Sequence, residues 1–327
     1  MRAFVVSETE SSFAREVRDV EAAPVDPGDA LIGVEYSGVN YKDALVARAR
    51  SRVPRAATLV GGVDAAGAVL ASGDPRLAAG ARVVAYGGDL GVARDGGFAE
   101  RLYAPTRLVS VLPAGITTRA AMIIGTAGVT AMASVMALES HGVSPGASVL
   151  VTGATGGVGS LAVTFLAARG YVVTASTGSG QDQWLRDRGA AAVIGRDEIA
   201  DRPERVLATE RWDGAVDCVG GVTLAQILRS LRYGGAVAAS GLVAGAALDT
   251  TVYPFITRAV SLLGIDSVEM GAAQRDRVWS ALGDLAPLVD LESLVDREAT
   301  LEELPDALDA VEVGATRGRI LVDPAAR

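Results

Sequence analysis

Four glycines stand close together in the stretch VTGATGGVGS at positions 151–160, directly after the aliphatic run 148–151. A strand, a glycine-rich turn and a helix in this order are typical of a dinucleotide-binding site. Gly156 would let the backbone approach a pyrophosphate, and Gly159 would let the helix pack close to the strand. The free N–H groups at the helix start would hold the phosphates, helped by the positive end of the helix dipole. A tight turn without a ligand is the alternative.

The end of the second strand of such a fold indicates which cofactor binds, because NAD enzymes usually place an acid there for the ribose 2′-hydroxyl. Here Ser176 and Thr177 occupy that end, and the first acid comes only at Asp182. Hydroxyl groups without a carboxylate suit a 2′-phosphate, so the sequence predicts NADPH. The alternative is that these residues cap the next helix.

Metal chemistry is not expected, because the chain has one histidine, His141, and one cysteine, Cys218. A catalytic zinc needs three protein ligands and a structural zinc usually needs four. We therefore expect structural roles for both residues and no metal. A single cysteine forms no internal disulfide, which fits a reducing cytoplasm, so a cytoplasmic location is expected.

Four arginines lie within eight positions, at 48, 50, 52 and 55, in a chain whose net charge is −9. Arg48, Arg50 and Arg52 are therefore candidates to bind the phosphates of a CoA thioester. The alternative is a solvated loop that balances nearby acids.

The elements that must position these residues change in kind near residue 118. Before it, short β-like runs at 30–36, 68–71, 82–86 and 108–112 are separated by turn residues, which predicts a mostly β domain. After a helical segment at 120–139, strands alternate with helices, which predicts an α/β fold with a parallel sheet. The strands are expected at 149–152, 171–176, 191–194, 215–219, 236–240 and 261–265, and the helices at 157–169, 182–188 and 222–231. From 290 the tail returns to short strands around a helix near 303–313.

The overall numbers limit the class of protein. The 327 residues suffice for two domains, and a hydrophobic content of 50% allows a large core. The net charge of −9 argues against nucleic acid as the main partner. The N-terminal residues do not resemble a signal peptide, and no apolar run is expected to reach the roughly 18–20 residues of a membrane span.

The chain resembles the medium-chain dehydrogenases/reductases, and within them the zinc-independent YhdH/AcuI group. The resemblance runs nearly from end to end. The residues that carry it are 40–45, 62–64, 66–67, 96–100, 121–128, 130–132, 151–160, 196–198, 233–235, 241–242, 254–256, 266–268 and 318–319. It implies a GroES-like, mostly β catalytic domain at 1–118 and 289–327, and a Rossmann NADPH-binding domain with a doubly wound parallel sheet at 119–288.

The resemblance also implies roles for single residues. The residues that match cofactor-binding positions are Thr155, Gly156, Gly157, Val158, Gly159, Ser176, Thr177, Gly178, Arg196, Leu242, Ile256 and Ser267. Tyr41 matches a tyrosine expected beside the nicotinamide, where it could orient the ring, bond a substrate carbonyl or pass a proton. Arg319 matches a tail residue that returns to the active site, and Asn40 is a candidate substrate contact. The alternatives are a core tyrosine for Tyr41 and a surface ion pair for Arg319.

The activity implied by this group is the NADPH-dependent reduction of an α,β-unsaturated acyl thioester, acryloyl-CoA to propanoyl-CoA. A quinone or enone reductase, a reductase of carrier-bound thioesters and a non-catalytic NADPH-binding sensor remain alternatives. The group often has an arginine where this chain has Ser179, so a weaker preference for NADPH is expected. A homodimer is expected through the strand at 261–265, since pairing would cover an exposed sheet edge.

Overall fold

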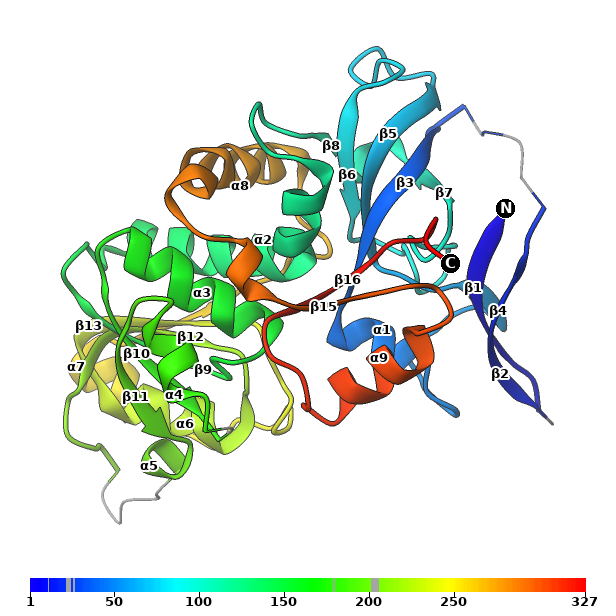
Figure 1. The fold of residues 1–327 in the computed structure, drawn as a ribbon. Coiled ribbons are helices and arrows are strands. Elements are labelled where there is room, and N and C mark those ends of the chain that lie inside the picture. The colour runs from blue at the N-terminus through cyan, green and yellow to red at the C-terminus, as the bar shows by residue number, and fades with distance from the viewer. Residues whose placement is uncertain (11, 22–24, 26, 179, 201–205) are drawn as a thin grey trace. The chain divides into compact units, whose positions relative to one another are not determined.

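The computed structural model describes residues 1–327 apart from 11, 22–24, 26, 179 and 201–205. Its internal contacts divide the chain into two compact units (Figure 1). Unit 1 contains Met1–Thr126, Ser267–Ala286 and Asp290–Arg327, and unit 2 contains Ala127–Asp266 and Pro287–Val289. Compared with the predicted boundaries, this division places residues 119–126 and 267–286 in unit 1.

Unit 1 is built on two sheets, one of three strands in the order β2-β1-β4 and one of seven. The larger sheet has the order β15-β16-β3-β5-β6-β8, with β7 also paired to β3. The strands are β1 (Arg2–Glu8), β2 (Phe13–Asp19), β3 (Asp29–Val39), β4 (Thr58–Val60), β5 (Asp64–Ser72), β6 (Arg82–Tyr86), β7 (Arg101–Pro105), β8 (Val109–Val111), β15 (Val295–Ala299) and β16 (Arg319–Val322). The helical segments are α1 (Tyr41–Val46), η1 (Thr106–Leu108), α8 (Ala272–Leu285), η3 (Glu292–Leu294) and α9 (Leu304–Glu312), with η2 (Ala286–Leu288) at the boundary.

The central strands of unit 1 bury apolar side chains against one another. Ile32 of β3, Val69 of β5 and Val83 of β6 are all buried and belong to one core cluster. Among the residues that the structure describes, the pairings in these sheets are antiparallel except for that of β15 with β16, which is parallel. The prediction of a mostly β domain is therefore confirmed.

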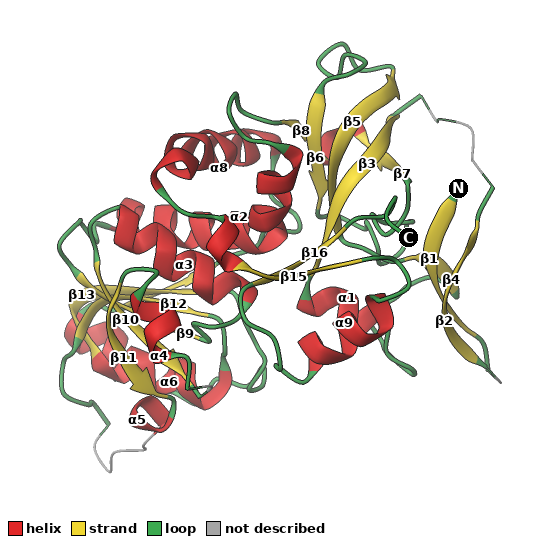
Figure 2. Ribbon diagram, in the orientation of Figure 1, coloured by secondary structure: helices red, strands yellow, loops and turns green. Residues whose placement is uncertain are grey.

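Unit 2 contains a six-stranded parallel sheet in the order β11-β10-β9-β12-β13-β14 (Figure 2). This is the doubly wound order of dinucleotide-binding folds. The strands are β9 (Ser148–Thr152), β10 (Val172–Thr177), β11 (Ala190–Gly195), β12 (Trp212–Asp217), β13 (Leu231–Ala239) and β14 (Ser261–Gly264). The helices are α3 (Gly157–Ala168), α4 (Asp182–Arg186), α5 (Asp197–Ala200), α6 (Gly221–Ser230) and α7 (Tyr253–Arg258). The predicted Rossmann sheet is confirmed.

The strands of unit 2 lack the alternation of apolar and polar residues seen in half-exposed strands. Val149, Leu150 and Val151 of β9 are successive residues and none exposes any surface. Successive side chains of a strand point to opposite faces. Both faces of this strand are therefore covered, as expected for a parallel sheet.

Helix α2 (Thr118–His141) is 24 residues long and bends at Gly125, whose φ of 50° and ψ of −162° are not helical. By length and composition it could cross a membrane, so the expectation that no apolar run reaches that length is wrong. Most of the apolar window is buried inside the structure, as in the core helix of a soluble protein.

Candidate functional site

The glycine-rich turn of unit 2 has the geometry that a dinucleotide requires. Gly153 has a φ of 59°, and α3 begins directly after Gly156, which caps it without a side-chain hydrogen bond. A Cβ at Gly159 would lie 2.2 Å from the carbonyl oxygen of Gly153, so only glycine lets the helix sit on the turn. The N-terminal amides of α3 thus face this turn, in which Gly156 is exposed. Gly156, Gly157, Val158 and Gly159 lie at this helix start, and their contact with a pyrophosphate stays a prediction.

The loop after β10 forms a cradle beside this turn. Ser176 and Thr177 are buried at the strand end, and the Thr177 hydroxyl lies 3.3 Å from the Thr155 hydroxyl. A Cβ at Gly178 would lie 2.5 Å from Nε and 2.7 Å from Nη2 of Arg196. Arg196 therefore lies against the loop backbone, and its contact with a 2′-phosphate stays a prediction. The prediction made for Ser179 lies outside the described residues.

Replacing Arg196 by alanine is expected to weaken NADPH binding about ten- to a hundredfold, because one charge-assisted contact to a phosphate is lost. NADH lacks the 2′-phosphate, so its affinity should not change. Fluorescence titration of both cofactors checks this, with Arg186→Ala on α4 as the control. Equal losses for NADPH and NADH, or no loss for either, would contradict the assignment.

Leu242 and Ile256 are 61% and 73% exposed, respectively, and both belong to unit 2. Ser267, the third residue expected near the ribose and nicotinamide, is buried in unit 1. The roles of all three remain predictions.

His141 and Cys218 lie at the ends of α2 and β12. The His141 Nε2 atom is 3.2 Å from the carbonyl oxygen of Gly234. Burial, followed by the charge of Asp217, raises the pKa of the Cys218 thiol to about 12, so it is protonated at neutral pH. Among the described residues, no group of three or more His, Cys, Asp and Glu side chains could hold a metal ion.

Tyr41 is the first residue of α1 in unit 1. The Asp43 carboxylate accepts the backbone N–H of Asn40 at 2.8 Å and that of Val63 at 2.9 Å, which fixes the start of this short helix. Tyr41 itself is 38% exposed, and its hydroxyl bonds to none of the residues that the structure describes. A core position for Tyr41 is therefore excluded, and its hydroxyl is available to a ligand.

Beneath Tyr41 lies a buried polar network. Arg319 is only 2% exposed and donates to the Asn40 side-chain oxygen at 3.1 Å, while the Asn40 side-chain amide donates to Asp64 at 3.1 Å. Desolvation lowers the pKa of Arg319, and the charges of Asp64 and Asp43 oppose that shift. The alternative of a surface ion pair for Arg319 is excluded. Its burial favours a positioning role, with Asn40 as the link to Tyr41.

The same network satisfies the backbone at the bend of α2. Arg319 donates to the carbonyl oxygen of Ile123 at 3.1 Å, and Asp64 accepts the N–H of Thr126 at 2.8 Å. These backbone groups lose helical partners where the helix turns at Gly125. A Cβ at Gly125 would lie 2.7 Å from Nη2 of Arg319 and 2.9 Å from Asp64, so glycine makes room for both side chains.

The buried carboxyl of Asp43 predicts a pH dependence. Burial, and then the charge of Asp64, raises the pKa of Asp43 from 3.8 to about 7. The folded chain therefore holds this proton more tightly than the unfolded chain does. The contribution of Asp43 to the free energy of unfolding must then fall as pH rises from 3.8 to about 7.

The expected result is that Asp43→Asn removes this part of the pH dependence. Thermal melts at about pH 5 and about pH 7.5, at equal ionic strength, measure it. From the lower to the higher pH, the melting temperature of the wild-type protein should fall by more than that of the variant. Identical changes in both proteins would show that Asp43 titrates normally.

The arginine segment is only partly placed as predicted. Arg52 lines a cavity of about 640 Å³ in unit 1, but Arg48 pairs with Glu312 at 3.4 Å, and Arg50 does not reach the lining. The φ of Arg50 is 57°, and its backbone N–H bonds to Glu8 at 2.7 Å, which turns this part of the loop away. Arg48 and Arg50 are therefore not part of this cavity, and their phosphate contacts stay a prediction.

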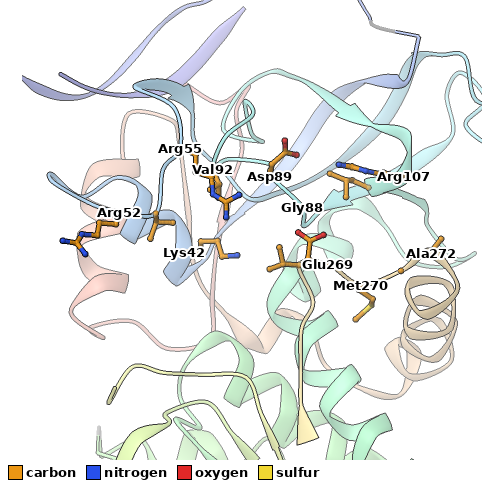
Figure 3. Close-up of a pocket in the computed structure, with 14 residues that line it drawn as sticks. Lys42, Arg52, Arg55, Gly88, Asp89, Val92, Arg107, Glu269, Met270 and Ala272 are labelled. Atoms are coloured by element: carbon orange, nitrogen blue, oxygen red, sulfur yellow. The ribbon is translucent and has the colours of Figure 1, made fainter. Parts of the chain in front are cut away.

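Three further cations line this cavity, and the sequence alone does not single them out as ligands. They are Lys42 beside Tyr41, Arg55 in the same loop as Arg52, and Arg107 in η1 (Figure 3). Arg107 enters from a segment about fifty positions further along the chain, so no local pattern could identify it. Arg55 is one of the four arginines at 48–55, but closeness in sequence does not show that Arg55 lines the cavity and Arg48 does not.

Comparison with known proteins agrees with the fold. Residues 26–114 match the alcohol dehydrogenase GroES-like domain, and residues 157–282 match the zinc-binding dehydrogenase family. The acrylyl-CoA reductase AcuI of Ruegeria pomeroyi is 43% identical over 325 residues, covering 98% of each chain.

Two further relatives have known structures. The yhdH oxidoreductase of Salmonella enterica, solved in complex with NADP, has a TM-score of 0.94 at 40% identity over 99% of each chain. YhfP of Bacillus subtilis, named as a quinone oxidoreductase, is 46% identical over 94% of this chain and 93% of its own. Its structure with NAD bound has a TM-score of 0.94 and covers 98% of each chain. The chain therefore belongs to the YhdH/AcuI group of the medium-chain dehydrogenases/reductases and is an oxidoreductase.

Proposed function

We propose that this oxidoreductase uses NADPH to reduce the activated C=C bond of an α,β-unsaturated acyl thioester, with acryloyl-CoA giving propanoyl-CoA. The observation that carries the proposal is the 43% identity to the AcuI acrylyl-CoA reductase across 98% of both chains. The exposed Tyr41 and the closeness of Arg196 to Gly178 support it, since a hydroxyl would be available to the substrate and a guanidinium to the 2′-phosphate.

In the proposed reaction some residues bind the cofactor, and others polarise the thioester carbonyl group. NADPH, when bound, supplies the hydride that reduces the β-carbon. The turn at 155–159 would hold its pyrophosphate, and Arg196 with the 176–178 loop would hold its 2′-phosphate. The Tyr41 hydroxyl donates a hydrogen bond to the thioester carbonyl oxygen, on which negative charge grows during reduction. Asn40, Asp43 and Arg319 keep the start of α1 in place for this contact.

A panel of acceptors tests the proposal. NADPH oxidation is followed by absorbance with acryloyl-CoA, crotonyl-CoA and 1,4-benzoquinone in parallel, with NADH as the cofactor control. The expected result is turnover of acryloyl-CoA well above that of the quinone, and a preference for NADPH. Turnover of the quinone alone would contradict the proposal. If none of the three acceptors causes NADPH oxidation, the result would favour a carrier-bound substrate or a non-catalytic NADPH-binding sensor.

A quinone reductase is the second candidate, and the observation that favours it is the 46% identity to YhfP. Both reactions use the same cofactor and need no other redox group. They differ in substrate recognition, because a small quinone has no phosphate for the basic cavity of unit 1 to bind.

We also propose a cytoplasmic homodimer. β14 lies at the edge of the unit 2 sheet, and Leu262 on it is partly exposed. Pairing with a second copy of this edge would satisfy its free backbone groups. Light scattering coupled to size exclusion should give twice the chain mass, whereas a monomer mass would contradict the proposal.

A further inference from the structure

The basic cavity of unit 1 has the charge and size of a nucleotide site, and all the residues that line it lie outside the dinucleotide fold of unit 2. We propose that it binds the 3′-phosphoadenosine diphosphate end of a CoA thioester, an inference that rests on the proposed function. The cavity is about 640 Å³, within the range of small-molecule sites. Lys42, Arg52, Arg55 and Arg107 surround it.

The charge around this cavity favours a ligand with several phosphates. None of the four cations forms a salt bridge within the part of the chain that the structure describes. In Figure 3 the charged ends of Lys42 and Arg55 point toward the middle of the cavity, whereas Arg52 extends at its outer edge. Two acids, Asp89 and Glu269, also line it, so the cations outnumber the acids in a chain whose net charge is −9. Like cations held close together are stabilised by a polyanion.

The remaining wall of the cavity is apolar. Its side chains are Val53, Val92, Leu108, Val268 and Met270, and Gly88, Gly271 and Ala272 leave space between them. Apolar side chains beside a group of cations suit an adenine base joined to phosphates, since inorganic phosphate would leave the apolar wall unused. The apolar wall therefore distinguishes a nucleotide from a simple anion.

The position of the cavity links it to the proposed reaction. Lys42, which lines it, directly follows Tyr41 in α1. Both residues belong to unit 1, so the same unit carries the group that would anchor the CoA head and the hydroxyl that would contact the thioester. The pantetheine arm would join the two positions.

The first experiment compares KM values of acryloyl-CoA and acryloyl-pantetheine in Arg55→Ala and Arg107→Ala variants. Each arginine is exposed, so the variants should fold. We expect the KM for acryloyl-CoA to rise roughly tenfold or more, with kcat nearly unchanged, because one charged contact to the head group is lost. The KM for acryloyl-pantetheine should not move. Arg48→Ala, in the same segment but outside the cavity, is the matched control. An unchanged KM for acryloyl-CoA, or equal rises for both substrates, would overturn the inference.

The second experiment needs no turnover, so it separates this inference from the proposed function. Calorimetry measures binding of adenosine 3′,5′-bisphosphate to the protein saturated with NADP⁺, which keeps the probe out of the dinucleotide site. Binding that weakens at least about tenfold in Arg55→Ala and not in Arg48→Ala supports the cavity as a nucleotide site, even if no thioester is reduced. No binding, or inorganic phosphate binding as tightly as the bisphosphate, would overturn it, even if acryloyl-CoA is a substrate.

Discussion

Replacing Arg319 by alanine is expected to lower the free energy of unfolding by about 3–5 kcal/mol, the usual cost of removing one partner from a buried charged network. Asp64 and Asp43 are buried and would lose the cation whose charge acts on both. The carbonyl oxygens of Met122 and Ile123 at the bend of α2 would also lose their donor. Chemical denaturation followed by fluorescence measures the change.

Three variants keep this prediction testable. Arg317 lies two positions before Arg319 and forms an exposed ion pair with Asp296. Arg317→Ala should lower the free energy of unfolding by less than about 1 kcal/mol. Arg319→Lys keeps the charge but not the fork of donors, so its loss should be intermediate. If Arg319→Ala fails to fold, adding Asp64→Asn should restore part of the stability, because it removes an unpaired buried charge. Equal small losses for Arg317→Ala and Arg319→Ala would contradict the network.

Replacing Tyr41 by phenylalanine is expected to lower kcat for acryloyl-CoA about 10²- to 10³-fold, the usual effect of removing one donor to a developing oxyanion. The ring stays in place, so KM and NADPH affinity should change little. Steady-state kinetics and cofactor titration measure these quantities, with Tyr233→Phe on the exposed surface of unit 2 as the control. A Tyr41→Phe enzyme with full kcat would show that the hydroxyl takes no part in the reaction.

The parallel sheet was predictable because its signals are local. β9, α3 and β10 lie within one or two residues of their expected bounds, since an apolar strand, a glycine turn and a helix follow one another directly. β13 was predicted too short, at 236–240, because Gly234 and Gly235 favour a turn by their type. In the structure this strand already pairs with β12 at Leu231, and the pairing is shifted between Trp212 and Gly214.

Distant contacts explain what could not be predicted. The composition of 120–139 predicts a helix but not its bend at Gly125, where Arg319, about two hundred positions away, donates to the carbonyl oxygen of Ile123. The spacing of the arginines makes Arg48 and Arg50 candidate phosphate ligands. In the structure Arg50 has a left-handed backbone and Arg48 forms an ion pair, and neither lines the cavity. The positions of Asn40 and Tyr41 follow from the start of α1, whereas the cavity beside them also needs Arg107 and residues 268–272.

The measurement that tests the central proposal most directly is the fate of the hydride. Acryloyl-CoA is incubated with the enzyme and NADPH deuterated at the transferable position, and the product is examined by mass spectrometry and NMR. The account predicts propanoyl-CoA that carries a single deuterium on its β-carbon, because the second hydrogen comes from a protonated group or solvent. Acryloyl-CoA that stays unreduced, or propanoyl-CoA without deuterium on that carbon, would contradict it.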